Sequence, residues 1–383
     1  MTPSATGQLS VVLAGGGSAG HTSPLIATAD ALRRRDPNVR LTAVGTERGL
    51  ETRVIPAAGL PLELIPPVPL PRRPTADLFR VPGRLRTAVR RAKQVLAEAE
   101  ADVVVGFGGY VAMPVYLAAR SAKLPIVVHE QNVVPGLANK VAARFADRVA
   151  VSFPDTPLRG GEFIGLPVRR GITGLDRAAR RAQAARAVGL DPNRPTLLVS
   201  GGSLGARSIN TAVVGARDEL LAGGIQILHV LGLKNIAETD VIIEHASGAR
   251  YVPVGYVDEM ADAYALADLM LCRSGAGTVV ETAVIGLPAV FVPLPHGNGE
   301  QQRNAAPVID AGGAKLITDA DCTPETVASL VIDLITDAGV LRHMGEAARS
   351  VMPADADERL ASMIVDANGR TGGSRRSGGE AVG

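Results

Sequence analysis

The 383-residue sequence contains no tryptophan, only two cysteines and few aromatic residues, 3% in all. Two thiols cannot build a disulfide framework, and they cannot form a metal site by themselves. No apolar run reaches about 18 residues, because the best one, Thr282–Pro295, is interrupted by glycine and proline. The core must therefore be assembled from valine, leucine, isoleucine and alanine.

The sequence also lacks a strong charge bias, because 40 Lys and Arg residues nearly balance 38 Asp and Glu residues, giving +2. A dedicated nucleic-acid-binding protein is usually more basic, so we expect no nucleic-acid partner. The N-terminus has neither a basic n-region nor a signal-peptide cleavage site. We therefore expect a reduced, cytosolic compartment, and neither secretion nor a membrane-spanning segment.

Short β-branched runs alternate with longer segments of helical spacing. The runs are Leu9–Ala14, Leu41–Val44, Asp102–Val105, Ile126–His129 and Arg148–Val151, then Thr196–Ser200, Ile225–Val230, Tyr251–Val254, Leu269–Cys272 and Ala289–Val292. Apolar strands that alternate with helices are typical of βαβ units and of a parallel sheet buried on both faces. The pattern occurs twice, so the sequence predicts an α/β fold with two doubly wound, Rossmann-like domains.

A stretch rich in glycine, proline and charge, Pro154–Asp176, separates the two halves. We expect an N-terminal domain over residues 1–168, to which a helix over 351–367 returns, and a C-terminal domain over 169–350. Residues 368–383 are rich in Gly, Ser and Arg and are expected to be disordered. Ligands of such sheets lie beyond the carboxyl ends of the strands, so we expect a site in a cleft between the domains.

Each half opens with a strand that runs into a glycine loop. The first loop, Gly15–Gly20, fits the G-x-G-x-x-G spacing. Three interpretations are open: a dinucleotide site with Glu47 as its acid, a turn needed only for packing, and phosphate recognition by N–H groups at a helix N-terminus. His21 follows directly, where strand-end loops carry chemistry. The second loop, Gly201–Gly205, has the equivalent place in the second half, which favours a ligand shared by both halves.

The most informative cluster follows the run Leu269–Cys272. Residues Arg273–Thr278 open a helix with small side chains, so backbone N–H groups and the helix dipole can face a diphosphate. Glu281, one turn further on, suits two ribose hydroxyls, although an acid in a first helical turn is also common for structural reasons. The polar loop Pro293–Asn304 adds amide side chains that match sugar hydroxyls.

These motifs resemble one family when they are taken together. The pattern R-S-G-A-G-T-x-x-E-x-x-x-x-G-x-P, with Q-x-x-N downstream, is similar to the nucleotide-sugar signature of GT-B glycosyltransferases. With A-G-G-G-S-A-G-H, G-F-G-G-Y, H-E-Q-N, L-P-V-R and G-G-S-L-G-A-R-S-I-N, the sequence resembles the MurG family of peptidoglycan glycosyltransferases from Leu9 to Ala367. The resemblance implies the GT-B architecture, two Rossmann-like domains that face each other across a cleft.

The resemblance also implies an activity. Members of this family transfer N-acetylglucosamine (GlcNAc) from UDP-GlcNAc to the 4-hydroxyl of N-acetylmuramic acid in lipid I, with inversion, and form lipid II for peptidoglycan. Alternatives are a UDP-GlcNAc 2-epimerase of the same architecture and a non-catalytic UDP-sugar-binding protein. An NAD-dependent oxidoreductase is a more distant alternative.

The resemblance also implies roles for the residues that match the motifs of the family. The donor would be bound by Ser18, Ala19, Gly20, Asn132, Arg169, Ser203, Val257, Gly275, Ala276, Gly277, Thr278, Glu281, and Gln301 or, in a shifted register, Gln302. Among these, Arg169 and Ser203 would contact the phosphates, and Val257 lies where backbone groups read uracil. His21 is the expected general base, with Glu130 as the alternative.

We expect neither a metal nor a cofactor. Metal-dependent sugar transferases often use a pair of carboxylates, but Asp319–Asp321 and Asp355–Asp357 occur late in the chain and are expected to be solvated turns. Arg169, Ser203 and the helix dipole at Gly275–Thr278 would instead stabilise the leaving UDP.

A basic stretch runs from Arg72 to Lys93, with Asp77 as its one acid and apolar residues between the cations. It is either a solvated helix face or an interfacial patch that holds the protein reversibly on anionic lipid. The expected patch residues are Arg72, Arg73, Phe79, Arg80, Arg84, Arg86, Arg90 and Arg91. The resemblance implies a peripheral protein on the cytoplasmic face of the bacterial inner membrane. Its implied partners are lipid I, the anionic membrane surface and other proteins of cell-wall synthesis.

Overall fold

The computed structural model describes residues 8–47, 49–68, 80–202, 205–296 and 298–376. Its contacts divide the chain into two compact units. Unit 1 comprises Met1–Arg169 and Asp355–Gly383, and unit 2 comprises Arg170–Ala354. Among the described helices, none combines the length and the apolar character needed to cross a bilayer.

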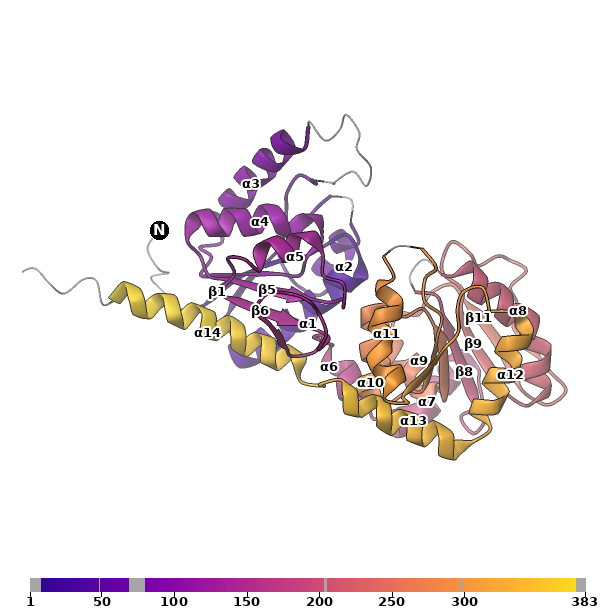
Figure 1. The fold of residues 1–383 in the computed structure, drawn as a ribbon. Helices are drawn as coiled ribbons and strands as arrows, with labels where there is room; N and C mark the ends of the chain where they lie inside the picture. Colours follow the sequence, from indigo (N-terminus) through magenta and orange to yellow (C-terminus); the bar gives the residue numbers. More distant parts are fainter. Residues whose placement is uncertain (1–7, 48, 69–79, 203–204, 297, 377–383) are drawn as a thin grey trace, which may run out of the picture. The chain divides into compact units, whose positions relative to one another are not determined.

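Unit 1 is a parallel sheet with helices on both faces (Figure 1). Its strands are β1 (Ser10–Ala14), β2 (Arg40–Gly45), β3 (Leu62–Leu64), β4 (Val103–Gly106), β5 (Ile126–Glu130), β6 (Arg148–Val151) and β7 (Gly161–Phe163). Its helices are α1 (Ala19–Arg35), α2 (Glu51–Ala57), α3 (Val81–Glu98), α4 (Gly109–Ala122), α5 (Leu137–Ala142) and α14 (Ala356–Arg376). The strand order β3-β2-β1-β4-β5-β6-β7 reverses between β1 and β4. Loops after these two central strands therefore lie at the point where such sheets bind ligands.

The strand sequences explain why both faces are covered. Every residue of β1 is buried, as is every residue of β4 and β5. Alternate side chains point to opposite faces. Val12 and Ala14 join the core that α3, α4 and α5 complete, whereas Val11 and Leu13 join the core of α1, α2 and α14. The prediction of a parallel sheet buried on both faces is confirmed for unit 1.

The C-terminal helix α14 returns to unit 1 and packs beside α1 (Figure 1). Leu360 and Ile364 are fully buried in the same core as Leu25. At the start of α14, Arg34 of α1 forms ion pairs with Asp357 and Glu358. The last helix is therefore an integral part of unit 1.

The bounds of α14 differ from the prediction. The expected helix over 351–367 begins instead at Ala356, and residues 351–354 belong to unit 2. The helix also continues to Arg376, into the tail that was expected to be disordered. A helix that already exists gains one backbone hydrogen bond for each residue added, which favours this extension. Residues 377–383 lie outside the described part of the chain.

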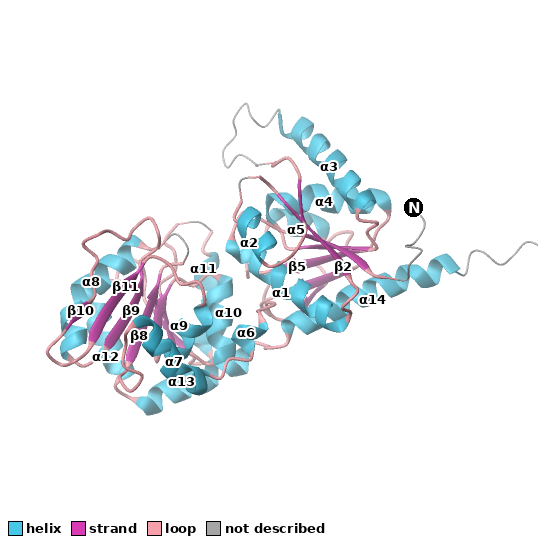
Figure 2. Ribbon diagram, turned by 180° about the vertical axis from the view of Figure 1, so that it is seen from behind, coloured by secondary structure: helices cyan, strands magenta, loops and turns pink. Residues whose placement is uncertain are grey.

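Unit 2 contains a second sheet, again with helices on both faces (Figure 2). Its strands are β8 (Thr196–Ser200), β9 (Gln226–Val230), β10 (Ile243–Glu244), β11 (Arg250–Val254), β12 (Leu269–Cys272), β13 (Ala289–Phe291) and β14 (Ala314–Leu316). Its helices are α6 (Arg170–Thr173), α7 (Arg177–Val188), α8 (Arg207–Ala222), α9 (Met260–Leu266), α10 (Ala276–Ile285), α11 (Glu300–Asp310), α12 (Pro324–Ile335) and α13 (Ala338–Val351). The strand order is β10-β11-β9-β8-β12-β13-β14, and only β10 is antiparallel to its neighbour among the described strands.

Candidate active site

The first glycine loop, which connects β1 to α1, is held by a buried carboxylate. Glu51 is fully buried and accepts hydrogen bonds from the N–H of Gly17 (2.8 Å) and from the N–H and the hydroxyl of Thr46 (both 3.0 Å). A Cβ at Gly16 would lie 2.5 Å from a Glu51 carboxylate oxygen, and Gly17 has a φ of +88°. The loop can follow this path only because both positions are glycine.

Glu51 remains charged despite its burial. Burial opposes its ionisation, but the hydrogen bonds from Gly17 and Thr46 outweigh this effect and hold the pKa of Glu51 below its ordinary value. Glu47, the acid that the dinucleotide interpretation of this loop would need, is exposed in the turn between β2 and α2. The glycines at 45 and 49 were the available signal, since a Cβ at either position would clash with the Glu51 side chain.

His21 lies in the first turn of α1. Its ring borders Gly109, where an added Cβ would be 3.0 Å from Cδ2 and 3.4 Å from Nε2. Its Nδ1 is buried without a hydrogen-bond partner among the described residues. Burial lowers the pKa of His21 to about 4, against the opposing influence of the Glu51 carboxylate. The imidazole is therefore neutral at pH 7 and can accept a proton.

The residues before His21 form an exposed helix N-terminus. Ser18 is the N-cap of α1, and its side chain makes no capping hydrogen bond. Ser18, Ala19 and Gly20 are all exposed. The Ser18 carbonyl accepts the N–H groups of His21 (3.1 Å) and Thr22 (3.2 Å), which begins the helix.

The H-E-Q-N motif lies at the end of β5. Glu130 is 2% exposed, and its carboxylate accepts the N–H of Asn132 (3.0 Å), the N–H of Gly136 (2.9 Å) and the side-chain amide of Asn139 (2.9 Å). Burial raises the pKa of Glu130, although these donors oppose the rise. With both of its oxygens engaged, Glu130 holds the turn that presents the half-buried Asn132.

Arg169 is the last residue of unit 1, and its side chain is exposed. It lies close enough to Asp30 to oppose the rise in the pKa of Asp30 that burial causes.

In unit 2 the expected donor residues follow the ends of β8, β11 and β12. Ser203 lies outside the described residues. Val257 is half-buried in the loop between β11 and α9. Gly275 is the N-cap of α10, and Ala276–Thr278 form its first turn. This places the backbone N–H groups of a helix N-terminus at the carboxyl end of β12, where they favour an anion.

Glu281 is held by a tyrosine from a neighbouring helix. The hydroxyl of Tyr264, on α9, donates to Oε2 of Glu281 at 2.6 Å. Tyr264 is only 2% exposed, and burial together with the Glu281 carboxylate raises its pKa well above the ordinary value. The phenol therefore stays protonated and acts as the donor. No sequence motif links Tyr264 to a carboxylate 17 residues away, so Tyr264 is not among the predicted site residues.

The two glutamines at the start of α11 have different surroundings. The side-chain oxygen of Gln301 accepts the N–H of Leu294 at 3.0 Å, which ties the preceding polar loop to the helix. Gln302 is exposed.

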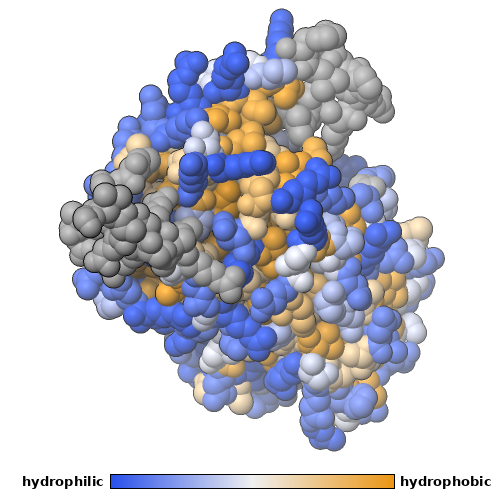
Figure 3. Space-filling view, turned by 60° about the vertical axis from the view of Figure 1, so that its left-hand side comes forward, coloured by the Kyte–Doolittle hydropathy of each residue, from blue (hydrophilic) through white to orange (hydrophobic). Residues whose placement is uncertain are grey.

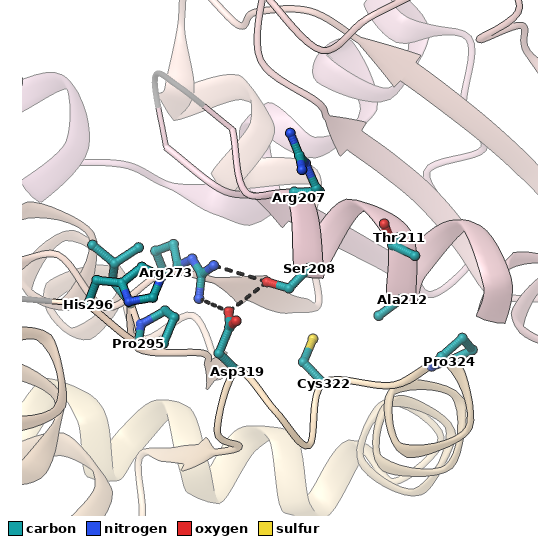
Figure 4. Close-up of a pocket in the computed structure, with 11 residues that line it drawn as sticks. Arg207, Ser208, Thr211, Ala212, Arg273, Pro295, His296, Asp319, Cys322 and Pro324 are labelled. Carbon is teal, nitrogen blue, oxygen red and sulfur yellow. Dashed lines mark hydrogen bonds and ion pairs between the residues drawn. The ribbon is translucent and has the colours of Figure 1, made fainter.

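A pocket of about 460 Å³ opens between the first half of α8 and the segments after β12, β13 and β14 (Figure 4). At one side of it, Arg273 lies 2.6 Å from Asp319 and donates to the Ser208 hydroxyl at 3.0 Å. The same hydroxyl donates to Asp319 at 2.6 Å. Burial opposes the ionisation of Asp319, but the bonds from Ser208 and Arg273 prevail and lower its pKa.

The expectation that both late acid pairs are solvated turns is wrong for one residue of each pair. Asp319 is only 23% exposed and pairs with Arg273, and Asp357 is 4% exposed and pairs with Arg34. Asp321 and Asp355 are exposed in turns, as expected. Among the described residues, no group of three or more His, Cys, Asp or Glu side chains is arranged to hold a metal ion.

Three residues of the expected membrane patch, Arg72, Arg73 and Phe79, lie outside the described residues. The other patch residues lie on α3 or immediately before it. Arg86 and Arg90 are exposed, whereas Arg91 pairs with Glu63 (2.7 Å) and Glu98 (3.2 Å). The charge of Arg91 is thus balanced within unit 1.

The fold and these loops define the class of the molecule as a two-domain glycosyltransferase of the GT-B type. The glycosyltransferase family 28 N-terminal domain matches residues 11–151, and the family 28 C-terminal domain matches residues 196–360. The chain belongs to glycosyltransferase family 28.

Close relatives carry one name, UDP-N-acetylglucosamine–N-acetylmuramyl-(pentapeptide) pyrophosphoryl-undecaprenol N-acetylglucosamine transferase. The relative from a Nocardioides species is 61% identical over 93% of this chain and 97% of its own length. The relative from Cutibacterium acnes is 59% identical over 94% of this chain and 97% of its own length.

Solved structures share the fold. MurG of Acinetobacter baumannii has a TM-score of 0.72 and 29% identity, covering 93% of this chain and 99% of its own. A structure described as a putative UDP-N-acetylglucosamine 2-epimerase from Listeria monocytogenes has a TM-score of 0.63 and only 14% identity, covering 93% of this chain and 96% of its own. The second likeness concerns the fold alone.

Proposed function

We propose that this protein transfers GlcNAc from UDP-GlcNAc to the 4-hydroxyl of N-acetylmuramic acid in lipid I and so forms lipid II. The observation that carries the proposal is the 61% identity, over nearly the whole chain, to a relative named for this transfer. The 2-epimerase alternative has no comparable support, because the neighbour of that name shares only 14% of residues.

Unit 2 supplies the nucleotide contacts in this proposal. The first turn of α10, Ala276–Thr278, offers N–H groups and the positive end of the helix dipole to the diphosphate. Glu281 accepts the ribose hydroxyls, and Val257 lies beside the uracil. Gln301, or Gln302 in the shifted register, contacts the sugar hydroxyls.

The remaining donor contacts come from family resemblance. We assign Ser203 and Arg169 to the phosphates and Asn132 to the sugar. A guanidinium such as that of Arg169 suits a diphosphate, because its N–H groups can bind two oxygens at once.

We assign the general base to His21 rather than to Glu130. His21 is neutral at pH 7, and its buried Nδ1 has no hydrogen-bond partner among the described residues, whereas both oxygens of Glu130 are engaged by N–H donors in a buried turn. His21 takes the proton of the acceptor hydroxyl while that oxygen attacks the anomeric carbon. The bond between the anomeric carbon and UDP breaks, and its electron pair passes to UDP. The helix N-terminus, Ser203 and Arg169 stabilise the negative charge that develops on UDP.

The lipid-linked acceptor requires access to a membrane surface. Figure 3 shows apolar side chains gathered among charged ones in the upper part of that view. Two large apolar side chains of unit 1, Tyr110 and Leu137, are 50% and 59% exposed. We propose that these residues and the basic residues of α3 hold the protein on the anionic cytoplasmic face of the membrane. Each cation near such a surface adds about 1 kcal/mol, so the attachment is reversible.

A transfer assay with radiolabelled UDP-GlcNAc and a lipid I analogue tests the proposed reaction. We expect label in the lipid-extractable product, at the same rate with and without a chelator. Release of an epimerised sugar without a labelled lipid would contradict the proposal and favour the epimerase.

The variant His21→Ala tests the assigned base. We expect kcat to fall by about 10²–10⁴-fold while the affinity for UDP-GlcNAc is retained, since positioned general bases contribute about that much. The matched variant Glu130→Gln should lose thermal stability as well as activity, because it removes an acceptor from a buried turn. Unchanged turnover in His21→Ala would exclude His21 from proton transfer.

Vesicle sedimentation tests the membrane surface. We expect the double variant Arg86→Glu/Arg90→Glu to bind anionic vesicles at least about tenfold more weakly at low salt. The control Arg186→Glu/Arg342→Glu reverses two exposed arginines of unit 2. Equal loss of binding in both variants would show only a general effect of charge.

A further inference from the structure

The hydrogen bond between Tyr264 and Glu281 connects two helices that are separate in sequence. Tyr264 lies on the short helix α9, and its hydroxyl is 2.6 Å from Oε2 of Glu281 on α10. The phenol is buried, whereas Glu281 is only partly buried and lies one turn from the helix N-terminus that faces the proposed diphosphate site. The tyrosine thus approaches the carboxylate from the protein interior.

The position of Tyr264 is itself fixed by a third helix. The guanidinium of Arg177, on α7, donates to the Tyr264 carbonyl at 3.1 Å and also to the carbonyl of Ala267. A further nitrogen of the same guanidinium lies 3.4 Å from the carbonyl of Gly286, the C-cap of α10. One half-buried arginine therefore links the C-terminal ends of α9 and α10, the helices that carry Tyr264 and Glu281.

The chemistry of this pair suits recognition of a diol. A carboxylate has about four acceptor positions, so one carboxylate can accept hydrogen bonds from a phenol and from hydroxyl groups of a ligand. An unrestrained glutamate would lose rotational freedom on binding, and fixing it beforehand reduces that cost. A ribose hydroxyl can donate a hydrogen bond to the carboxylate. The C–H group that replaces the 2′-hydroxyl in a deoxyribose cannot.

We propose that Tyr264 is a positioning residue for nucleotide recognition: its hydroxyl fixes the Glu281 carboxylate so that both ribose hydroxyls are bound, which makes the enzyme selective for ribonucleoside over 2′-deoxyribonucleoside diphosphates. This inference rests on the proposed function, in which Glu281 binds the ribose. It adds the origin of the selectivity and a residue outside the family motifs.

Binding of UDP and 2′-deoxy-UDP to the full-length protein, measured by calorimetry, tests the inference. Wild type should prefer UDP by about tenfold or more, because a hydrogen bond to a charged group is lost with the 2′-hydroxyl. Tyr264→Phe should reduce this preference by about fivefold, mainly through weaker UDP binding, because one hydrogen bond of ordinary strength is removed. The ring remains, so packing is preserved.

Tyr251→Phe is the matched control. Tyr251 is equally buried in the same unit, and its hydroxyl contacts His229 at 3.1 Å instead of a carboxylate. This variant should lose a similar amount of thermal stability and keep the full preference for UDP. If Tyr264→Phe and Tyr251→Phe both lose stability and both retain the preference, Tyr264 serves packing alone and the inference is wrong.

The double variant Tyr264→Phe/Glu281→Gln separates this inference from the proposed function. Glu281→Gln should reduce the preference by itself, and adding Tyr264→Phe should then change nothing further. An additional loss in the double variant would show that Tyr264 acts by another route. If Glu281→Gln leaves the preference intact, the ribose contact and the inference both fail, while GlcNAc transfer is judged separately by the lipid I assay.

Discussion

Of two ionisable residues at the first glycine loop, one is charged and the other is neutral at pH 7. Glu51 is ionised because three hydrogen bonds outweigh its burial, and His21 is neutral because burial lowers its pKa to about 4. The loop therefore combines a fixed negative charge with an imidazole that is ready to accept a proton. Once protonated, that imidazole is stabilised by the nearby carboxylate.

The pH dependence of activity follows from the pKa of His21. A base with a pKa of about 4 is deprotonated throughout the range from pH 5.5 to 7.5. We expect kcat/KM for transfer to stay level over this range and to fall only as the pH approaches 4. A fall centred near pH 6.5, the ordinary value for histidine, would contradict either the buried state of His21 or its role as the base.

The variant Glu51→Gln tests how the loop is held. Glutamine cannot accept hydrogen bonds from Gly17 and Thr46 with both ends of its side chain, because its amide nitrogen is a donor. We expect a loss of about 2–4 kcal/mol in the free energy of unfolding, measured by urea denaturation, and a clear loss of kcat. Glu47→Gln, an exposed neighbour, should change neither quantity.

The motifs point to the glycine loops, His21 and Glu281, but not to the buried side chains that hold them in place. Glycine loops, His21 and Glu281 are recognisable because they are local in sequence and have distinctive spacing. Glu51 and Tyr264 act on partners 34 and 17 residues away, and each contact exists only after two elements have packed. A periodic pattern indicates which face of a helix or strand is buried. It does not indicate which buried polar groups form hydrogen bonds with each other.

Strands were predicted where they are central and missed where they lie at an edge. The ten runs identified from the sequence all became strands, whereas β3, β7, β10 and β14 were not identified. These four are the outermost strands of the two sheets. Each has two or three residues, a strand neighbour on one side only and at least one residue that is not buried. They therefore lack the continuous apolar run that marks a buried parallel strand.

Helix α14 shows that sequence position does not decide which unit an element stabilises. Leu360 is fully buried in unit 1, so Leu360→Ala should destabilise that unit by about 2–5 kcal/mol through lost contacts and a cavity. Hydrogen exchange should accelerate in β1 and β4 and remain unchanged in β8 and β12. Val365→Ala, on the same helix but 43% exposed, is the control and should have little effect. Faster exchange in β8 would contradict the assignment of α14 to unit 1 alone.

Across the whole molecule, each unit carries a buried histidine on a strand of its sheet. His129 of β5 is fully buried with Nε2 3.1 Å from the Gly165 carbonyl, and His229 of β9 is fully buried with Nδ1 3.1 Å from the Tyr251 hydroxyl. Burial lowers the pKa of both to about 4. In both units, therefore, acid can act by protonating a buried histidine that is neutral in the folded state.

Moderate acid should destabilise the protein through these two residues and through His21, whose pKa burial lowers to the same value of about 4. In the unfolded chain a histidine binds a proton near pH 6.5, whereas His129 and His229 stay neutral in the folded state down to about pH 4. The unfolded state thus binds more protons between these values. The free energy of unfolding therefore keeps its full value, as far as these residues are concerned, above pH 6.5, and it falls towards pH 4 by up to roughly 3 kcal/mol for each residue. In thermal unfolding from pH 7 to 4.5, His129→Gln should have a lower Tm than wild type at pH 7 but a smaller decrease with acid. His343→Gln, exposed on α13, should follow wild type, and an identical acid dependence in all three proteins would mean that carboxylates alone cause the loss.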